Sequence, residues 1–141
     1  MKTRAFLDTN VFIYGYEFPD SNSAKIIELI NEGEIEAIIS ERVLKEVTEY
    51  FNKYYFIEVS RKFRKYLLDT CTIVMNHEVL KEIKELKGKI KDKDLEQLAA
   101  ARKYGLKFLI SYDRDFEGFD EYNTPKKFLE MLNKETKDSD F

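Results

Sequence analysis

Two apolar runs that end in acids, one near each end of the sequence, constrain the fold of this 141-residue chain most strongly. The run at residues 5–7 is followed by Asp8, and the run at residues 108–110 leads through Ser111 and Tyr112 to Asp113. An ionised Asp beside apolar strand residues is costly unless it is paired or coordinates a metal. Parallel strands of an α/β sheet direct their carboxyl ends towards a shared crevice. The pattern therefore indicates an acidic pocket suited to hard divalent cations, which prefer oxygen ligands.

Strand-like and helix-like segments alternate along the chain. Short apolar runs predict strands at residues 3–8, 36–40, 72–75 and 107–110. Apolar residues at helical spacing predict helices at 21–31, 41–54, 56–68, 78–87, 92–104 and 125–132. This alternation is typical of a three-layer α/β/α sandwich with a mainly parallel central sheet. We expect one such domain over residues 1–133, followed by a polar, frayed tail at residues 134–141.

The composition fits a globular protein of the cytoplasm. Hydrophobic residues make up 43% of the chain and charged residues 36%. The single cysteine excludes an intrachain disulfide framework and suits a reducing compartment. No signal peptide and no apolar run of membrane-spanning length is present, so we expect no membrane association. The net charge of −3 does not identify a partner, because an acidic pocket would hide a local basic face from that average.

Glu46 is the candidate acid of the helix expected at residues 41–54. It lies at the edge of an apolar stripe formed by Val43, Val47, Tyr50 and Tyr54, so it can reach the rim of the core from a rigid element. Taken alone, an ordinary exposed carboxylate is the simpler interpretation of this residue.

Asp92 and Asp94 open an Ala-rich helix. An Asp in the first turn stabilises the helix dipole and caps free amides, which explains one acid but not two. Asp94 aligns with Leu98 and Ala101 at positions i, i+4 and i+7, so it projects from a packed face. We therefore expect Asp92 to cap the helix and Asp94 to be the functional acid.

Asp113 and Asp115 follow the last apolar run, where a turn would also use Asp. Asp8 has a comparable alternative role as the cap of the next helix. However, Ser111 precedes Asp113 much as Thr9 follows Asp8, so both acids are accompanied by a hydroxyl. This repetition favours a hydroxyl-lined acidic site over turns or caps alone.

Several carboxylates that share one pocket repel one another, so their presence implies a cation. Magnesium or manganese fits a set of oxygen ligands, whereas one histidine and one cysteine provide no zinc cluster. Metals that are held by carboxylates and bound to phosphate oxygens suit the hydrolysis of phosphodiesters.

The chain resembles the PIN-domain ribonucleases, which include the toxins of VapBC toxin–antitoxin pairs. The resemblance covers residues 3–132 and rests on the motifs at 6–10, 40–47, 92–101 and 109–116. It implies a catalytic, metal-binding quartet of Asp8, Glu46, Asp94 and Asp113 with Mg²⁺ or Mn²⁺ as cofactor. It also implies supporting roles for Thr9, Asn10, Asp92, Ser111 and Asp115. The family more often has Thr at the position of Ser111, but Ser keeps the hydroxyl.

The leading interpretation is a metal-dependent endoribonuclease that hydrolyses single-stranded or structured RNA, with an antitoxin protein as a candidate partner. An aspartyl phosphatase is disfavoured because no second acid stands two residues after Asp8. A receiver domain is disfavoured because residues 72–76 contain no acid. A third alternative is a PIN-like RNA-binding or protein-interaction module with weak or no catalytic activity.

Aromatic and basic residues interleave over residues 54–66. They could form a surface that tracks phosphates and stacks on bases of single-stranded RNA. Helical spacing already explains the pattern as an amphipathic helix whose aromatic residues pack in the core or in a dimer contact. We favour the second interpretation and expect a homodimer.

Overall fold

Five parallel strands form the centre of the structure, a computed structural model that describes residues 2–138. The strands are β1 (Thr3–Leu7), β2 (Ile35–Ser40), β3 (Thr72–Val74), β4 (Leu109–Ile110) and β5 (Tyr122–Asn123). Their order across the sheet is β3-β2-β1-β4-β5, so the first strand is central. The chain builds the sheet outwards on one side of β1 and then on the other. The carboxyl ends of β1 and β4 therefore meet where the winding reverses, the usual place for a binding crevice in such sheets.

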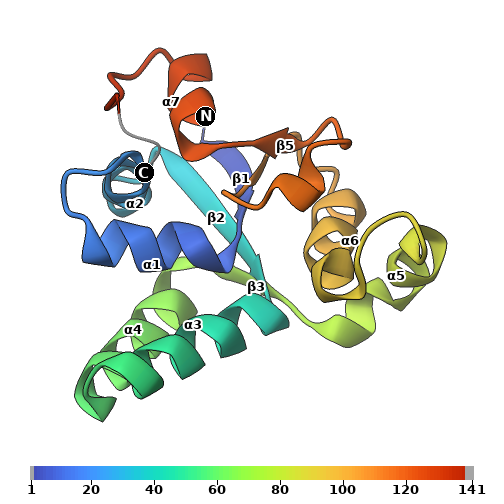
Figure 1. Ribbon diagram of the computed structural model, residues 1–141, viewed down its shortest axis with the longest axis horizontal. Coiled ribbons are helices and arrows are strands. Elements are labelled where there is room, and N and C mark those ends of the chain that lie inside the picture. Colours follow the sequence, from blue (N-terminus) through green and yellow to red (C-terminus); the bar gives the residue numbers. More distant parts are fainter. Residues whose placement is uncertain (1, 139–141) are drawn as a thin grey trace.

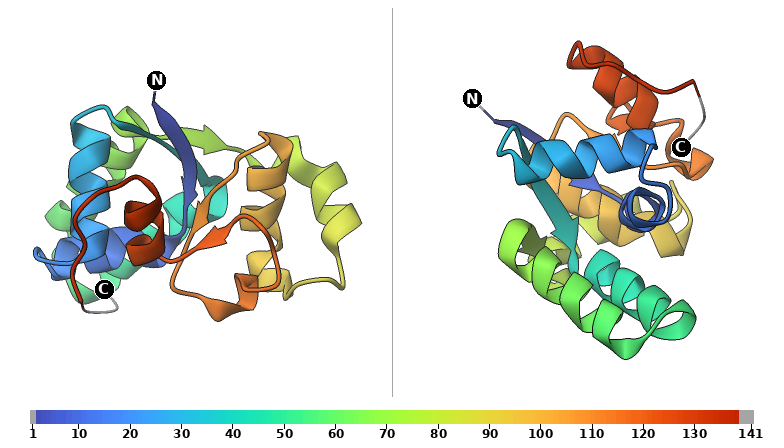
Figure 2. Two further views of the ribbon diagram at one scale, coloured as in Figure 1. Left: turned by 90° about the horizontal axis from the view of Figure 1, so that it is seen from above. Right: turned by 90° about the vertical axis from the view of Figure 1, so that its left-hand side faces the viewer.

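Helices cover both faces of this sheet (Figures 1 and 2). They are α1 (Thr9–Glu17), α2 (Asn22–Asn31), α3 (Glu41–Tyr54), α4 (Ile57–Thr70), α5 (Leu80–Leu86), α6 (Leu95–Lys103) and α7 (Pro125–Met131). Short 3₁₀ turns occupy η1 (Asn76–Val79), η2 (Asp92–Asp94) and η3 (Arg114–Phe116). Helices α5 and α6 lie on one side of the sheet and α1 and α2 on the other, while α3 and α4 form a hairpin near β3. The predicted three-layer α/β/α sandwich with a parallel sheet is confirmed. None of the helices within residues 2–138 has the length and apolarity needed to cross a bilayer.

The central strand is apolar because it is covered on both faces. Ala5, Phe6 and Leu7 are all fully buried, as expected for a parallel strand between two helical layers. The segment 98–101 of α6 is also fully buried. Its three consecutive alanines allow this helix to lie close to β1 and β2, which it contacts.

One helix and one strand were not expected from the sequence. Helix α1 was not predicted, because it begins directly after β1 and contains Gly15, a residue that weakens a helical pattern. The absence of a side chain at Gly15 lets α1 approach α2, since an added Cβ would collide with Ile27. Strand β5 was also missed, because two residues give no periodic signal.

The apolar stripe of α3 was predicted only in part. Val43 and Val47 are buried as expected, but the stripe continues through Phe51, whereas Tyr54 is 60% exposed. The stripe turns towards Phe51 because this ring stacks on Phe63 of α4, with centroids 4.6 Å apart.

The segment after α7 is held by a side chain of α2. Asn22 Oδ1 accepts a hydrogen bond from the amide of Lys137 at 2.7 Å, and Asn22 Nδ2 donates to the carbonyl of Lys137 at 3.3 Å. Residues 134–138 form no helix or strand, and the frayed tail expected at residues 134–141 stays a prediction. Residues 139–141 of the predicted tail lie outside the described residues. The domain boundary at residue 133 stays a prediction.

Candidate functional site

The site is built around the junction between β1 and α1. The register of the sheet pairs Leu7 with Ile110, so the next residues, Asp8 and Ser111, lie side by side. The amide of Asp8 continues the ladder by donating to the carbonyl of Ile110 at 3.0 Å. Asp8 is also the N-cap of α1, so the cap and the strand-end acid are the same residue.

Both oxygens of the Asp8 carboxylate are held. Oδ1 accepts from the amide of Thr9 at 2.8 Å, and Oδ2 accepts from the hydroxyl of Ser111 at 2.7 Å. Asp8 is only 5% exposed, and its burial raises its pKa from 3.8 to about 6, despite the opposing effect of the two hydrogen bonds. The nearby carboxylates of Glu46 and Asp94 raise the pKa further. The ionised form is therefore costly here, which is the expected property of an acid that binds a cation.

Ser111 and Asn10 join the end of β4 to α1. Ser111 is fully buried, and its Oγ accepts hydrogen bonds from Asn10 Nδ2 at 3.3 Å and from the amide of Asp113 at 2.9 Å. Asn10 Oδ1 in turn accepts from the amide of Tyr112 at 3.3 Å. A hydroxyl at position 111 thus fixes Asp8 and the backbone that carries Asp113 at the same time.

Glu46 reaches this junction from α3. Ser40 caps the helix, and its Oγ accepts from the amide of Val43 at 3.2 Å. Glu46 Oε1 then accepts from the hydroxyl of Thr9 at 2.8 Å, which ties α3 to the start of α1. Its other oxygen, Oε2, lies 3.7 Å from Nε of Arg42, one helical turn earlier.

The two acids before α6 have different environments. Asp94 is buried with 3% exposure, whereas Asp92 is exposed. Burial raises the pKa of Asp94, and the ammonium of Lys93 opposes this rise. The expectation that Asp92 caps the helix is wrong. Residues 92–94 form the separate turn η2, α6 begins at Leu95, and neither element has a side-chain cap.

Asp113 and Asp115 are brought close to Asp94 by the turn η3. Asp113 Oδ1 accepts from the amide of Asp115 at 2.9 Å, so the second acid is folded back towards the first. One carboxylate oxygen from each of Asp94, Asp113 and Asp115 lies within 4.8 Å of the others. The ammonium of Lys93 lies among these acids, 2.8 Å from Asp113 Oδ2. Lys91 and Lys93 lower the pKa of Asp115, and Asp113 is the largest cause of a raised pKa at Lys93.

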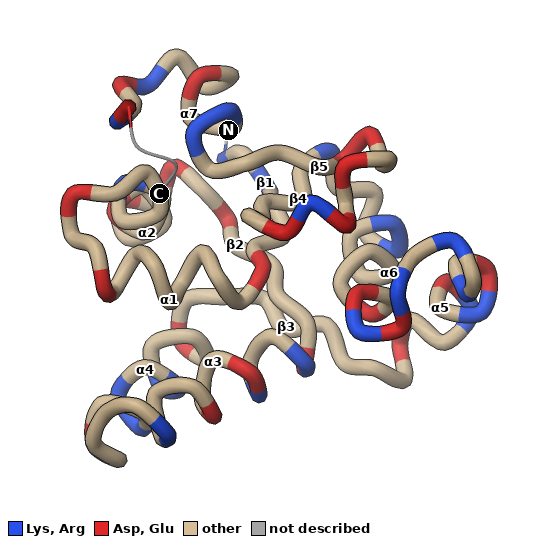
Figure 3. Tube along the Cα trace, in the orientation of Figure 1, with Lys and Arg blue, Asp and Glu red and all other residues tan. Residues whose placement is uncertain are grey.

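These side chains surround one pocket of about 210 Å³. Its lining includes the predicted quartet and two of the predicted supporting residues, namely Asp8, Glu46, Asp94, Asp113, Thr9 and Asn10. Ser111 and Asp115 contact members of this lining, whereas exposed Asp92 does not line the pocket. Sequence reasoning missed Arg42, Lys93 and Gln97, which also line it. Figure 3 shows acidic and basic positions interleaved around the start of α6 and after β4.

The donor set fits a hard divalent cation. Within residues 2–138, Asp94 Oδ2 and Gln97 Oε1 are buried oxygens that accept no hydrogen bond, although Lys93 Nζ lies 3.1 Å from the former. Buried acceptors of this kind are normally satisfied, so a ligand at this position would remove the deficit. All of the candidate ligand atoms are oxygens, which match Mg²⁺ or Mn²⁺.

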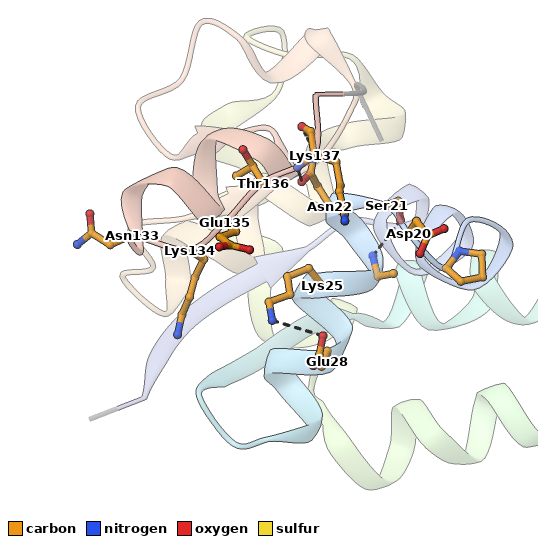
Figure 4. Close-up of a pocket in the computed structure, with 12 residues that line it drawn as sticks. Asp20, Ser21, Asn22, Lys25, Glu28, Asn133, Lys134, Glu135, Thr136 and Lys137 are labelled. Atoms are coloured by element: carbon orange, nitrogen blue, oxygen red, sulfur yellow. Dashed lines mark hydrogen bonds and ion pairs between the residues drawn. The ribbon is translucent and has the colours of Figure 1, made fainter.

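A larger pocket of about 580 Å³ lies elsewhere, between α2 and the segment 133–137 (Figure 4). Its charged residues are of both signs, and Lys25 pairs with Glu28 across 3.5 Å. It contains no cluster of acids like that at the β1–β4 junction. The larger volume of this pocket therefore does not make it the candidate functional site. The smaller pocket at the β1–β4 junction remains the candidate, because the acids lie there.

Comparisons with solved structures and with a family model agree with the α/β/α fold described above. The chain is similar to a toxin–antitoxin complex from Klebsiella pneumoniae, with 25% identity, a TM-score of 0.69, and coverage of 86% of this chain and 97% of the other. It is similar in fold to VapBC2 from Rickettsia felis, solved with a DNA fragment from their promoter (17% identity, TM-score 0.69, coverage 86% and 98%). It is also similar in fold to VapC20 of Mycobacterium tuberculosis, described as a sarcin–ricin loop cleaving toxin (16% identity, TM-score 0.62, coverage 81% and 93%). No curated protein matches the sequence. The PIN domain model matches residues 5–122, which is most of the chain, and the protein therefore belongs to the PIN domain family.

Proposed function

We propose that this protein is a divalent-metal-dependent endoribonuclease that hydrolyses phosphodiester bonds of RNA. The observation that carries the proposal is the convergence of acids from separate elements on one pocket. Asp8 comes from the β1–α1 junction, Glu46 from α3, Asp94 from η2 and Asp113 from the end of β4. Membership of the PIN family supports the same conclusion, as does the likeness to a toxin described as cleaving the sarcin–ricin loop.

In this proposal Asp8, Glu46, Asp94 and Asp113 hold Mg²⁺ or Mn²⁺, and Asp115 joins them through its place beside Asp94 and Asp113. When bound, the metal polarises the phosphoryl group and activates water. Ser111 and Thr9 orient the acids: the first donates to Asp8, the second to Glu46.

Arg42 supplies positive charge on the α3 side of the pocket. Its side chain lines the pocket and is 40% exposed, so the guanidinium is accessible to an oxygen of the substrate. Arg is well suited to this role, because its planar donors match a phosphate group. We therefore assign it to binding the RNA backbone beside the metal ligands.

We further propose that the protein is the toxin of a toxin–antitoxin pair and acts in the cytoplasm as a homodimer. The antitoxin proposal is supported by the toxin–antitoxin complexes among its structural relatives. A reducing compartment suits Cys71, the only cysteine, whose burial raises the thiol pKa to about 11 and disfavours the reactive thiolate.

The test is cleavage of a single-stranded RNA oligonucleotide by wild type, Glu46→Gln and Glu49→Gln. Glu49 is the matched control, because it lies one turn further along α3, is 66% exposed and pairs with Lys45. We expect wild type and the control to cut only with added Mg²⁺ or Mn²⁺ and to stop with EDTA, while Glu46→Gln loses activity. RNA or antitoxin binding without cleavage in any metal would instead support the non-catalytic module.

A further inference from the structure

We propose that Lys93 is an internal counter-ion of the acidic site, and that a divalent cation binds by displacing its ammonium. The proposal rests on the proposed metal site and concerns how that site is kept neutral before metal arrives. Sequence reasoning gave no role to Lys93, which stands between Asp92 and Asp94.

The position of the ammonium carries the argument. Lys93 Nζ lies 2.8 Å from Asp113 Oδ2, 3.1 Å from Asp94 Oδ2 and 3.3 Å from Asp115 Oδ2. These are the same three acids whose oxygens lie within 4.8 Å of one another. An ammonium has three N–H donors and no acceptor, so its donors match three carboxylates. Lys93 thus neutralises part of the charge of the acidic cluster that a cation would bind, while Asp94 Oδ2 still accepts no hydrogen bond.

The two cations exclude each other at this place. Mg²⁺ requires oxygen ligands at about 2.0–2.1 Å, so a metal bound by these three oxygens would lie almost where the ammonium lies. Two positive charges at such a separation repel strongly, and each would compete for the same lone pairs. Metal binding at this cluster therefore requires Lys93 to leave.

The environment of Lys93 makes its departure easy. Its side chain is 51% exposed, whereas that of Asp94 is only 4% exposed, so the lysine can move and the acid cannot. The lysine stem is flexible and its ammonium is readily hydrated. When the ammonium of Lys93 is displaced, a partly exposed ion pair is lost and the ammonium becomes solvated, which costs little free energy. The buried Asp94 gains a divalent cation as its partner.

Lys91 provides a matched control. It is also a lysine at the same turn, is 66% exposed and pairs with Asp115 alone, at 3.2 Å. Lys91→Met removes the same charge from the same neighbourhood without removing a group from the centre of the cluster. Comparison of the two variants therefore separates direct competition from a general change in electrostatic potential.

The experiment is calorimetric titration of Mn²⁺ into wild type, Lys93→Met and Lys91→Met, together with thermal unfolding in EDTA. Because three ion pairs oppose the metal, we expect Lys93→Met to bind Mn²⁺ roughly tenfold more tightly than wild type. Lys91→Met should stay near the wild-type affinity. In EDTA, Lys93→Met should unfold at a lower temperature than wild type, because its carboxylates are left unneutralised, and saturating Mn²⁺ should abolish this deficit.

Equal or weaker binding by Lys93→Met than by wild type would overturn the proposal while leaving the metal site intact. An equal gain in affinity in both lysine variants would also overturn it, in favour of a general electrostatic effect. If wild type and both variants bind no Mn²⁺, the proposed metal-dependent function fails together with this inference.

Discussion

At the scale of single residues, the same side chains serve folding and chemistry. Asp8 caps α1 and ends β1, and Ser111 fixes both Asp8 and the backbone amide of Asp113. Alanine at the cap alone would cost about 1 kcal/mol. Amide-for-carboxylate substitutions are therefore the better probes of chemistry at position 8, because they retain an acceptor for the cap.

Replacement of any one of the four pocket acids should lower RNA cleavage about as much as replacement of several. We expect Asp8→Asn, Glu46→Gln, Asp94→Asn and Asp113→Asn each to lower the rate of RNA cleavage by about 100-fold or more, since all four face one pocket. Double variants should lose little more than single ones, because one removal already disables the shared assembly. Single-turnover cleavage assays measure both effects. Additive losses in the double variants would contradict a shared site.

Asp92 and Asp115 differ in their relation to the acidic cluster, which includes Asp115 but not Asp92. The exposed Asp92 should tolerate replacement by Asn with little loss of cleavage. Asp115→Asn should cost more than Asp92→Asn, because Asp115 belongs to the acidic cluster. The same cleavage assay tests this order, and a larger loss at Asp92 than at Asp94 would reverse our choice of functional acid at the start of α6.

Asp8 should also make the stability of the metal-free protein depend on pH. Its pKa is about 6 in the folded protein against 3.8 for the free side chain, so the folded state binds a proton more tightly than the unfolded state. The resulting stabilisation is complete below pH 4 and is lost as the pH rises through 6. Asp8→Asn should therefore match wild type at pH 4 and exceed it at pH 7 by up to about 3 kcal/mol.

This difference can be measured by urea unfolding in EDTA across the pH range, with Asp20→Asn at an exposed position as the control. A constant difference between Asp8→Asn and wild type from pH 4 to pH 7 would show that ionisation of Asp8 does not oppose folding.

At the scale of elements, the residues at the ends of helices and strands determine which elements can be predicted from the sequence. Strands β1 and β4 were predictable because their apolar runs end abruptly in polar residues, and this gave Asp8 and Asp113. Helix α1 was not predictable, because no loop precedes it and Gly15 interrupts its pattern. The contribution of Lys93 was hidden because a lysine between two acids is normal on any exposed turn. The Lys93 side chain reaches Asp113 only because η2 and η3 fold against each other.

The contact between α2 and the segment after α7 gives a prediction at this scale. Asn22 is 1% exposed and makes both hydrogen bonds to the backbone of Lys137 (Figure 4). Asn22→Ala should lower the free energy of unfolding by about 1 kcal/mol and speed hydrogen exchange at the Lys137 amide. Glu135→Ala, at an exposed position of the same segment, is the control. Unchanged exchange at Lys137 in Asn22→Ala would show that other contacts hold the segment.

At the scale of the whole molecule, the aromatic residues of the α3–α4 hairpin remain to be explained. Tyr54 is 60% exposed, Phe56 79% and Ile57 48%, while Tyr16 of α1 adds to the same surface through a ring contact with Tyr55. Apolar groups that are exposed together in this way mark interaction surfaces more often than isolated ones do. The expectation that the aromatic residues of this segment pack in the core or in a dimer contact is confirmed for Phe63, which packs on the buried Phe51 inside the hairpin.

We expect the hairpin surface to be buried in a homodimer. Phe56→Glu should convert the dimer into a monomer, because it places a charge at the centre of an apolar contact. Leu80→Glu is the control, since Leu80 is 58% exposed but lies on α5, across the sheet. Sedimentation velocity over a range of concentrations measures both variants. A monomeric wild type at high concentration would contradict the expected dimer.

The hydrogen bond between Asp8 and Ser111 has a consequence for synthesis. It joins residues 103 positions apart, and β4 is itself completed by β5, whose Asn123 carbonyl accepts from the Ser111 amide. A growing chain on the ribosome therefore holds Asp8 from the start but cannot assemble the pocket until residues near 123 have emerged. Contacts between residues this far apart in the sequence form late in folding, because closing the long loop between them costs conformational entropy. On the proposed function, the nascent chain cannot cut the RNA around it until the residues up to about 123 have emerged from the ribosome.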